Sequence, residues 1–428
     1  MNDPETSNTK VSLFRDRNFF WLSAGALISM IGDQFTLIAL PWLVLKMTGD
    51  PLVLGTVLAV TSIPRALFIL VGGALVDRHS PKRVLMLTKY VNTVLLGVLA
   101  ALVFSGKLTL PLVYGLALAI GLSTAFSIPA ATSIMPHVVA REHLQRANGT
   151  MMGMRQLSFF VGPLLAGGLI AISGGDHNGT MQDARGLGLA FLLDALTFAL
   201  SAWTLARVAV SEGARGQGVV QSVWKAVGEG VRYCWNDRDL RVCFSYWAAI
   251  ALFISGPVQV AVPVLAEHVG DSAAALGLLA GAHGAGTLLG MAVTGIRPGF
   301  SLGSFGTTIL VLDGVIGALF MPLGLIETAW QGGVLLLVIG MLGGFVQVTV
   351  YTWLQRAAAP ALLGRTMAMF MFIFMGIAPM SAAVTGLLMR SITLPQLFAG
   401  SGALLVAIVA VAFAFSDMRT VGAARSMQ

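Results

Sequence analysis

Long apolar segments alternate with short polar stretches along almost the whole chain. A helix needs about 20 apolar residues to cross the hydrocarbon core of a bilayer, because each residue adds 1.5 Å of rise. Twelve segments reach that length. The pattern predicts an all-α polytopic membrane protein with twelve transmembrane helices in two six-helix bundles. The expected spans are 19–45, 52–76, 84–105, 110–135, 147–173, 186–208, 242–266, 274–296, 304–326, 332–355, 366–390 and 395–416.

Composition agrees with this class. Of the 428 residues 56% are hydrophobic and 11% charged, with a mean hydropathy of +0.84, which is beyond what a soluble fold of this size can bury. The net charge of +7 does not indicate a nucleic-acid partner, because the cations are scattered singly instead of forming one basic face. The stretch 1–10 lacks a cleavable hydrophobic region, so we expect the first span to act as its own insertion signal.

The cations predict the orientation, because short loops rich in Lys and Arg stay on the cytoplasmic side. With both termini inside, most cations fall on that side, including Lys82, Arg83 and Lys89. We therefore expect a multi-pass protein of a bacterial inner membrane with cytoplasmic termini. Its two cysteines, Cys234 and Cys243, are expected as reduced thiols. The cations expected outside are Lys46, Lys107, Arg185 and Arg390.

One hydrophilic gap divides the chain. It predicts a six-helix bundle at 1–209, a cytoplasmic connector at 210–241 and a second six-helix bundle at 242–428. Within the connector, Val219 to Trp235 has valines at helical spacing, which favours an amphipathic helix on the inner leaflet, with a bare linker as the alternative. Two six-helix repeats of parallel sense are one recurring architecture of transporters, with the substrate site at the midplane between them.

A few ionisable side chains lie inside the predicted spans. Burying each in the bilayer costs about 2.5–3.5 kcal/mol unless it has a partner or lies in a water-filled cavity. Such groups are therefore candidates for function. They are Asp33, Arg65, Arg155, Asp194, His283 and Asp313.

Asp33, followed by Gln34, is the leading candidate for coupling and substrate binding. It lies close to the middle of the first span, and Arg65 falls at nearly the same depth on the antiparallel second span. Arg155 in the fifth span lies within plausible reach. One hypothesis is a carboxylate that alternates between a proton and an arginine or a cationic substrate. The alternative is a static ion pair that only fixes helix packing.

The other polar positions favour plainer roles. For Asp194, in an apolar setting, we expect a structural hydrogen bond to a neighbouring helix, with coupling as the alternative. For Asp313, which has no nearby cation in the sequence, we expect a protonated or water-facing carboxyl group, with a proton relay as the alternative. His283 stands without a second histidine or cysteine, so we expect no metal. No Walker A, His-Glu-x-x-His or Cys-x-x-Cys pattern occurs, and we expect neither a cofactor nor an enzyme.

The fifth span carries the run Gly162-Pro163-Leu164-Leu165-Ala166-Gly167-Gly168. Proline removes a backbone donor and the glycines remove side-chain bulk, so a helix can bend and pack closely here. The run indicates either a hinge with a tight seal or ordinary helix packing.

Two motifs resemble signatures of the major facilitator superfamily. The turn between the second and third spans is similar to the pattern Gly-x-Leu-Ala-Asp-Arg-x-Gly-Arg-Arg, although Ser80 and Pro81 replace a glycine and an arginine. The Gly162-Pro163 run is similar to the antiporter signature Gly-Pro-x-x-Gly-Gly. Further segments resemble the drug:proton antiporter subfamily that contains macrolide-efflux pumps and the enterobactin exporter. The matching residues of the turn are Gly73, Leu75, Asp77, Arg78 and Lys82.

The resemblance implies a secondary active transporter that exports a small amphipathic or hydrophobic, drug-like compound by proton antiport with alternating access. It implies small-molecule, proton and lipid partners and a monomer. Alternatives are a siderophore or lysophospholipid carrier, an importer, and a non-transporting receptor or scaffold. The family's gate places the aspartate of the turn against the start of helix eleven. The fourth span lacks the arginine of many proton-coupled relatives. The implied cytoplasmic gate is Gly73, Asp77, Arg78, Lys82, Arg83, Gly364 and Arg365.

Overall fold

The computed structural model describes residues 16–78, 80–173, 184–210, 223–270, 272–296, 300–359 and 362–422, and these are helical with no strands. The first six long helices are α1 (Arg17–Thr48), α2 (Pro51–Arg78), α3 (Pro81–Phe104), α4 (Leu110–Ser133), α5 (Leu144–Ser173) and α6 (Ala184–Ala206). The rest are α7 (Val223–Asn236), α8 (Arg238–Phe253), α9 (Ser255–Gly270), α10 (Ala273–Ile296), α11 (Phe305–Phe320), α12 (Ala329–Ala357), α13 (Leu363–Phe372), α14 (Ala378–Leu388) and α15 (Leu394–Phe415). Short turns are η2 (Met135–His137), η3 (Arg141–His143), η4 (Met321–Leu325) and η6 (Asp417–Thr420), and η5 (Ile373–Ile377) is π-helical.

The twelve predicted spans are confirmed: twelve helical segments among the described residues are long and apolar enough to cross a membrane. Two of them are not continuous α-helices. The seventh span consists of α8 and α9, which meet at Ile254, and the eleventh consists of α13, η5 and α14. Most boundaries lie within three residues of the expected positions, since the apolar length sets them.

The break in the seventh span has a local cause. Gly256 and Pro257 follow it, and the Gly256 N–H donates a hydrogen bond of 2.9 Å to Ser381 Oγ of α14. A Cβ atom on Gly256 would lie 2.2 Å from the backbone oxygen of Ser381. Because proline cannot donate a helical hydrogen bond and glycine allows this close approach, α9 packs directly on the backbone of α14.

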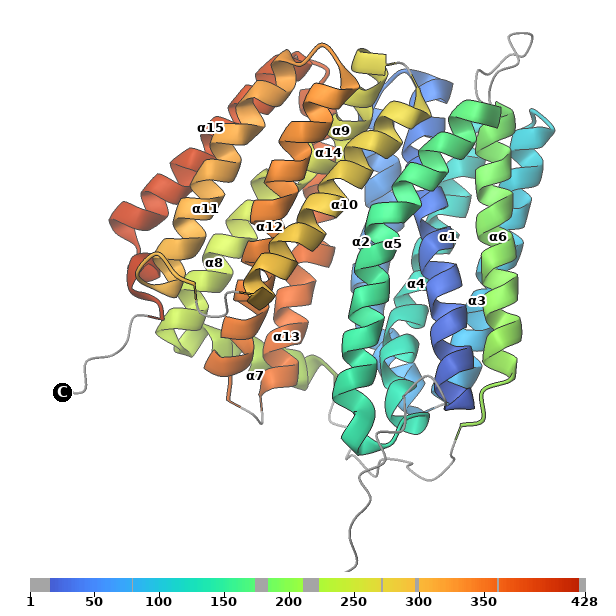
Figure 1. The fold of residues 1–428 in the computed structure, drawn as a ribbon, viewed down its shortest axis with the longest axis horizontal. Coiled ribbons are helices and arrows are strands. Elements are labelled where there is room, and N and C mark those ends of the chain that lie inside the picture. Colours follow the sequence, from blue (N-terminus) through green and yellow to red (C-terminus); the bar gives the residue numbers. More distant parts are fainter. Residues whose placement is uncertain are drawn as a thin grey trace, which may run out of the picture.

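The helices run between two ends of the molecule. The end that we call the connector end holds the start of α1, the α2–α3 turn, the last residues of α6 and the whole of α7. The far end holds the α1–α2, α3–α4, α11–α12 and α14–α15 turns. In Figure 1 the first six spans, blue to green, lie beside the last six, yellow to red, with α7 at the bottom.

Packing differs between the two ends. At the far end one continuous hydrophobic core includes residues of both sets of helices, among them Trp42 of α1, Ile170 of α5, Leu265 of α9 and Phe398 of α15. At the connector end there are two separate cores, one within α1 and α3–α6 and one within the helices from α7 onward. Among the described residues, the apolar cores of the two sets of helices therefore merge at the far end and stay separate at the connector end, where α2 still contacts α7 and η5.

Glycines bring the two sets together at the far end. A Cβ atom on Gly55 of α2 would lie 2.5 Å from the backbone oxygen of Ala382 in α14, and one on Gly386 would lie 2.5 Å from that of Pro51. No side chain separates the backbones at these two crossings. Close contact of this kind is typical of helices that associate inside a membrane.

Helix α7 lies in the segment between the sixth and seventh spans. Its residue Cys234 is buried, and its Tyr233 hydroxyl accepts a hydrogen bond of 3.1 Å from the Ala359 N–H. Burial raises the pKa of the Cys234 thiol above its usual value. Trp235 and Val231 remain exposed. One face of α7 therefore packs on the protein near α12 and α13, and the apolar residues of another are left uncovered.

The expectation that Lys89 lies on the cytoplasmic side is wrong. Lys89 lies two turns inside α3, counted from Pro81, and only 8% of its surface is exposed. Its neighbour Lys82 does lie at the connector end, where its Nζ donates to the backbone oxygens of Val208 (2.6 Å) and Ala206 (3.3 Å). From the sequence, Lys82 and Lys89 are assigned to the same cytoplasmic loop because the two residues are only two helical turns apart. Lys82 binds the last carbonyl group of α6 and one just after it, whereas Lys89 is an intramembrane cation.

Candidate functional site

Asp33 lies in α1 with an exposed side chain, although it is inside a predicted span. It makes no hydrogen bond or ion pair within the part of the chain that the structure describes. Lys89 of α3 and Arg155 of α5 are the cations that act on its carboxyl group electrostatically. A carboxylate held in a span without a direct partner, but near two cations, is a typical arrangement of an ion-coupling site.

Lys89 is the residue of this site that the sequence analysis missed. Its Nζ donates to Ser29 Oγ of α1 at 3.3 Å and lies 5.5 Å from the centroid of the Phe198 ring in α6. Its charge also acts on both Asp33 and Asp194. Counting from Pro81, a residue suited to the first turn of a helix, would have placed Lys89 well inside the membrane.

Asp194 of α6 is almost fully buried, with 1% of its surface exposed. Its carboxyl group accepts a hydrogen bond from the Thr36 hydroxyl of α1 and another, at 3.3 Å, from Thr197. The bond from Thr36 confirms the expected hydrogen bond to a neighbouring helix. A Cβ atom on Gly32 would lie 2.7 Å from Asp194 Oδ1, so the absence of a side chain there lets α1 and α6 approach.

Arg155 is exposed on α5, and its charge acts on Asp33 of α1 and on Tyr351 of α12. It therefore lies between the first and the last six spans. Gln34 of α1 is buried against the same helix, α5: a Cβ atom on Gly162 would lie 2.3 Å from Gln34 Cγ. Gln34 Oε1 has no hydrogen-bond partner among the described residues. Gln34 therefore packs on α5 at the Gly162-Pro163 motif.

The structure does not bring Arg65 to Asp33. Arg65 is half-buried on α2, where Nη2 donates to Ser62 Oγ at 3.2 Å, and its Nε has no partner among the described residues. The cations acting on Asp33 come from α3 and α5. Equal depth in the membrane did not imply contact, since the direction of each side chain around its helix axis decides that.

Asp313 of α11 forms a separate polar pair in the last six spans. Tyr246 of α8 donates a hydrogen bond of 2.7 Å to Asp313 Oδ2, and 7% of the Asp313 surface is exposed. Of the two expected states, protonated or water-facing, the water-facing one is wrong, because the aromatic neighbour covers the carboxyl group, and the protonated one stays a prediction. His283 of α10 is half-buried, and its Nδ1 has no partner in the described part. No cluster of metal-ligating side chains occurs among the residues searched, which are the described ones.

Most of the gate implied by the family signature lies outside the described side chains. This holds for Gly73, Asp77, Arg78, Gly364 and Arg365. Within the described set, Arg83 is exposed and Lys82 caps α6. The helix-five motif is fully described: Gly162 packs on Gln34, and Gly167 packs on α10, where its Cβ would lie 2.6 Å from the backbone oxygen of Ala273.

The α5–α10 contact extends along both helices. A Cβ atom on Gly277 would lie 2.9 Å from Gly167 Cα, and one on Gly284 would lie 2.4 Å from the backbone oxygen of Phe159. Nearer the connector end, Gln156 Nε2 donates to Met291 Sδ at 3.0 Å. We call this contact the α5–α10 seam. It joins one helix of the first set to one of the last set with little side-chain material between them.

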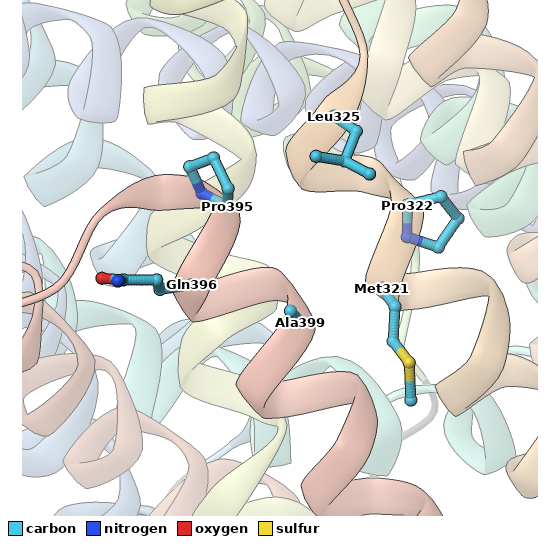
Figure 2. Close-up of a pocket in the computed structure, with 6 residues that line it drawn as sticks. All are labelled: Met321, Pro322, Leu325, Pro395, Gln396 and Ala399. Carbon is cyan, nitrogen blue, oxygen red and sulfur yellow. The ribbon is translucent and has the colours of Figure 1, made fainter.

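Two surface recesses lie away from these residues. One, of about 460 Å³, lies between η4 and α15 at the far end (Figure 2). Its polar residue Gln396 points away from the apolar side chains across the recess and accepts from the Thr393 N–H at 2.9 Å. The other, of about 600 Å³, lies between α8 and α15 near Trp235 and Arg241. Neither recess includes Asp33, Lys89 or Arg155. The candidate site is therefore defined by the contacts and charges of these three residues and not by a surface recess.

Ion pairs join the two sets of helices at the far end. Arg390 Nη2, after α14, lies 2.5 Å from Asp50 Oδ2, before α2, and Lys46 Nζ lies 4.0 Å from Glu267 Oε1 of α9. The Arg390 guanidinium and the N–H of Leu52 hold the pKa of Asp50 below its usual value. This pair adds to the apolar closure of the far end.

Replacing Asp50 with asparagine is expected to open the far end modestly. Because the pair is exposed, we expect only a few-fold rise in the open population. The lowered pKa of Asp50 means that the pair is intact at neutral pH and is lost only as the pH falls through the acid range, below the usual pKa of an aspartate. Distances between spin labels on Lys107 and Glu327, both exposed at the far end, measure the change.

The matched control is Arg238→Gln. Arg238 Nε donates to Asp417 Oδ2 at 2.8 Å, a pair that lies within the last set of helices at the connector end. This variant is expected to leave the far-end distances unchanged. Equal distance distributions for Asp50→Asn and the unmodified protein at every pH would show that the Asp50–Arg390 pair does not hold the far end closed.

Comparison with known proteins places this geometry in a family. The family model described as "Major Facilitator Superfamily" matches residues 22–383. The chain is 29% identical over 384 residues to the multidrug efflux pump Tap of Mycobacterium tuberculosis, with 86% of each chain covered. It is 21% identical over 408 residues to macrolide efflux protein A of Streptococcus pyogenes, covering 94% of this chain and 96% of the relative.

A further relative is the enterobactin exporter EntS of Salmonella choleraesuis, at 28% identity over 355 residues, covering 79% of this chain and 77% of the relative. Among solved structures, the nucleoside transporter NupG superposes with a TM-score of 0.70 at 14% identity, covering 93% of this chain and 99% of that chain. At this identity the likeness concerns the fold.

Proposed function

The chain belongs to the Major Facilitator Superfamily, and from this premise we propose that it exports a small amphipathic or hydrophobic compound by proton antiport with alternating access. Membership makes it a multi-pass membrane transporter and not an enzyme. The direction of transport, the coupling ion and the class of compound are the parts that we propose.

The observation that carries the proposal is the state of Asp33. Its carboxyl group is exposed inside a span, has no direct partner among the described residues, and lies near Lys89 and Arg155. A carboxyl group that has no permanent partner can bind and release a proton. A static ion pair, the alternative reading, would require a contact that the described residues do not make.

The arrangement of the cores supports export. The far end has one core shared by both sets of helices, whereas the connector end has two separate cores. The connector end also has most of the Lys and Arg residues, which is typical of the cytoplasmic side of a bacterial inner membrane. In this form Asp33 would be reached from the cytoplasm, where an exporter takes up its cargo.

In the proposed cycle the proton and the compound use the same central region by turns. Cargo bound near Asp33 and Arg155 from the connector end favours loss of the proton from Asp33. Rocking of the two sets of helices then opens the far end, where the cargo leaves and a proton binds. Each change of conformation is driven by the difference between the affinities of the two conformations for the proton and for the cargo.

The relatives suggest the class of cargo. Two are named as a multidrug efflux pump and a macrolide efflux protein, which favours a drug-like compound. The enterobactin exporter favours a siderophore as the second candidate. Arg155, exposed between α5 and α12, suits an anionic or hydroxyl-rich group of such a molecule, whereas Asp33 suits a cationic one.

Inside-out vesicles with an acidified lumen test the proposal. We expect accumulation of ethidium, a lipophilic cation, or of erythromycin, a macrolide, and expect an ionophore that removes the proton gradient to abolish it. Added compound should also release protons from the lumen, measured with a pH-sensitive dye. Accumulation that persists without a proton gradient, or that requires sodium, would contradict proton antiport. Proton release by a siderophore alone would favour the second candidate.

A further inference from the structure

Lys89 is a cation that the proposed cycle does not yet use. It is 8% exposed, lies inside a span, and belongs to none of the ion pairs between described residues. An ammonium group without a carboxylate partner is costly in the bilayer. Its position therefore needs an explanation from the groups around it.

The contacts of Lys89 are weak and lie one helical turn from Asp33. Its Nζ donates to Ser29 Oγ at 3.3 Å, at the long end for such a bond. Ser29 and Asp33 are four residues apart on α1, so they are neighbours on one face of that helix. The second contact, 5.5 Å to the Phe198 ring centroid, is with an aromatic face. Lys89 is thus held beside Asp33 without a bond to it.

The two carboxyl groups near Lys89 differ in their own support. Asp194 accepts hydrogen bonds from Thr36 and Thr197, whereas Asp33 accepts none from the described residues. An ionised Asp194 is therefore stabilised by hydrogen bonds without Lys89, whereas an ionised Asp33 depends on the charges of Lys89 and Arg155 alone. A lysine side chain has a flexible four-carbon stem that can move its charge over about one helical turn, roughly 5.4 Å.

We propose that Lys89 is a positioning residue that supplies the counter-charge to Asp33 when Asp33 releases its proton, an inference that rests on the proton antiport proposed above. In the form described, the ammonium group is parked on Ser29. On loss of the proton from Asp33 it moves by one turn of α1 to the carboxylate. On reprotonation it returns to Ser29 and the Phe198 ring.

Other titratable groups lie on the helices packed around this site. Arg155 of α5 acts on Asp33, and Asp33 acts in turn on Asp194 of α6. Helix α2 carries Arg65, which bonds to Ser62, and α4 carries Tyr114, whose hydroxyl is paired with that of Thr56 at 2.5 Å. Helices α9 and α10, which also touch α1, carry Glu267, His268 and His283. Lys89 is the buried cation of this group whose stem reaches Asp33 from within the first set of helices.

Infrared spectroscopy of the full-length protein in lipid nanodiscs tests this role with the proton as the only ligand. The carboxyl band that disappears in Asp33→Asn reports the protonation of Asp33. In Lys89→Met we expect the pH midpoint of that band to move upward by about one to three pH units, because a nearby opposite charge is worth that much. In Lys89→Arg, which keeps the charge, we expect a midpoint close to that of the unmodified protein.

Two controls keep the experiment decisive. Lys107→Met removes an exposed lysine just after α3 and is expected to leave the midpoint unchanged. Lys89→Met combined with Asp194→Asn removes one charge of each sign, so it serves where the single variant does not fold, and its midpoint is expected to lie above that of Asp194→Asn alone. A midpoint in Lys89→Met equal to that of the unmodified protein, or one in the double variant equal to that of Asp194→Asn, would overturn the counter-charge role and leave proton antiport intact. A protein in which no Asp33 band titrates at all would overturn proton antiport itself.

Discussion

Replacing Asp33 with asparagine is expected to abolish uphill export while the protein stays folded and still equilibrates the same compound across the membrane. Asparagine has nearly the size of aspartic acid, but it neither binds nor releases a proton. Because Asp33 is exposed and makes no hydrogen bond with the described residues, its neutralisation leaves no buried group unpaired. The measurement compares accumulation against a gradient with counterflow of labelled compound in proteoliposomes.

Asp313→Asn is the matched control for this experiment. It also neutralises a carboxyl group inside a span, but one that is buried and accepts a hydrogen bond from Tyr246. We expect this variant to keep uphill export and to lose stability, by about 1–3 kcal/mol for a weakened buried hydrogen bond. The reverse outcome, with export lost only in Asp313→Asn, would move the coupling site to the last six spans. Full export in Asp33→Asn would contradict the proposed cycle.

The spans were predictable because one physical requirement sets them. Each needs about 20 apolar residues, and the polar turns between them are short, so the count of twelve follows from length alone. The two interruptions were not predictable to the same degree. The Gly256-Pro257 pair signals a weak point, but the break at Ile254 also depends on the hydrogen bond from Gly256 to Ser381, which is far away in the sequence.

The candidate site was predicted in part for a related reason. Hydropathy and helical rise give the depth of a residue, and they singled out Asp33 and Arg155 correctly as intramembrane groups. They do not give the rotation of a helix about its axis, which is set by packing. Arg65 therefore bonds to Ser62 on its own helix, and Lys89 from α3 takes the position next to Asp33. Where only depth is known, the sequence names the helices of a polar site but not the partners.

The helix-five motif leads to the second large effect. We expect Gly167→Val to abolish both uphill export and counterflow. A Cβ atom at this position would lie 2.6 Å from the backbone oxygen of Ala273 and 2.8 Å from Gly277 Cα, and backbone atoms of α10 cannot move aside as a side chain can. Valine therefore forces the α5–α10 seam apart. Overpacking of this kind also costs roughly 1–3 kcal/mol of stability.

Gly168→Val provides the control within the same motif. Apart from its own helix, no atom lies within 4 Å of a Cβ at Gly168, so valine there faces open space. Valine is also a slightly better helix former than glycine, by roughly 0.3 kcal/mol, so no propensity cost is expected. For both variants, export and counterflow are measured together with the thermal unfolding temperature in detergent.

The same measurements on Gly167→Ala separate two roles of the seam. If the seam is only a packing contact, Gly167→Ala lowers the unfolding temperature and transport in proportion. If the two sets of helices must slide along it during alternating access, Gly167→Ala loses transport while remaining folded. Wild-type transport in Gly167→Val would show that the seam is not closed this tightly in the working protein.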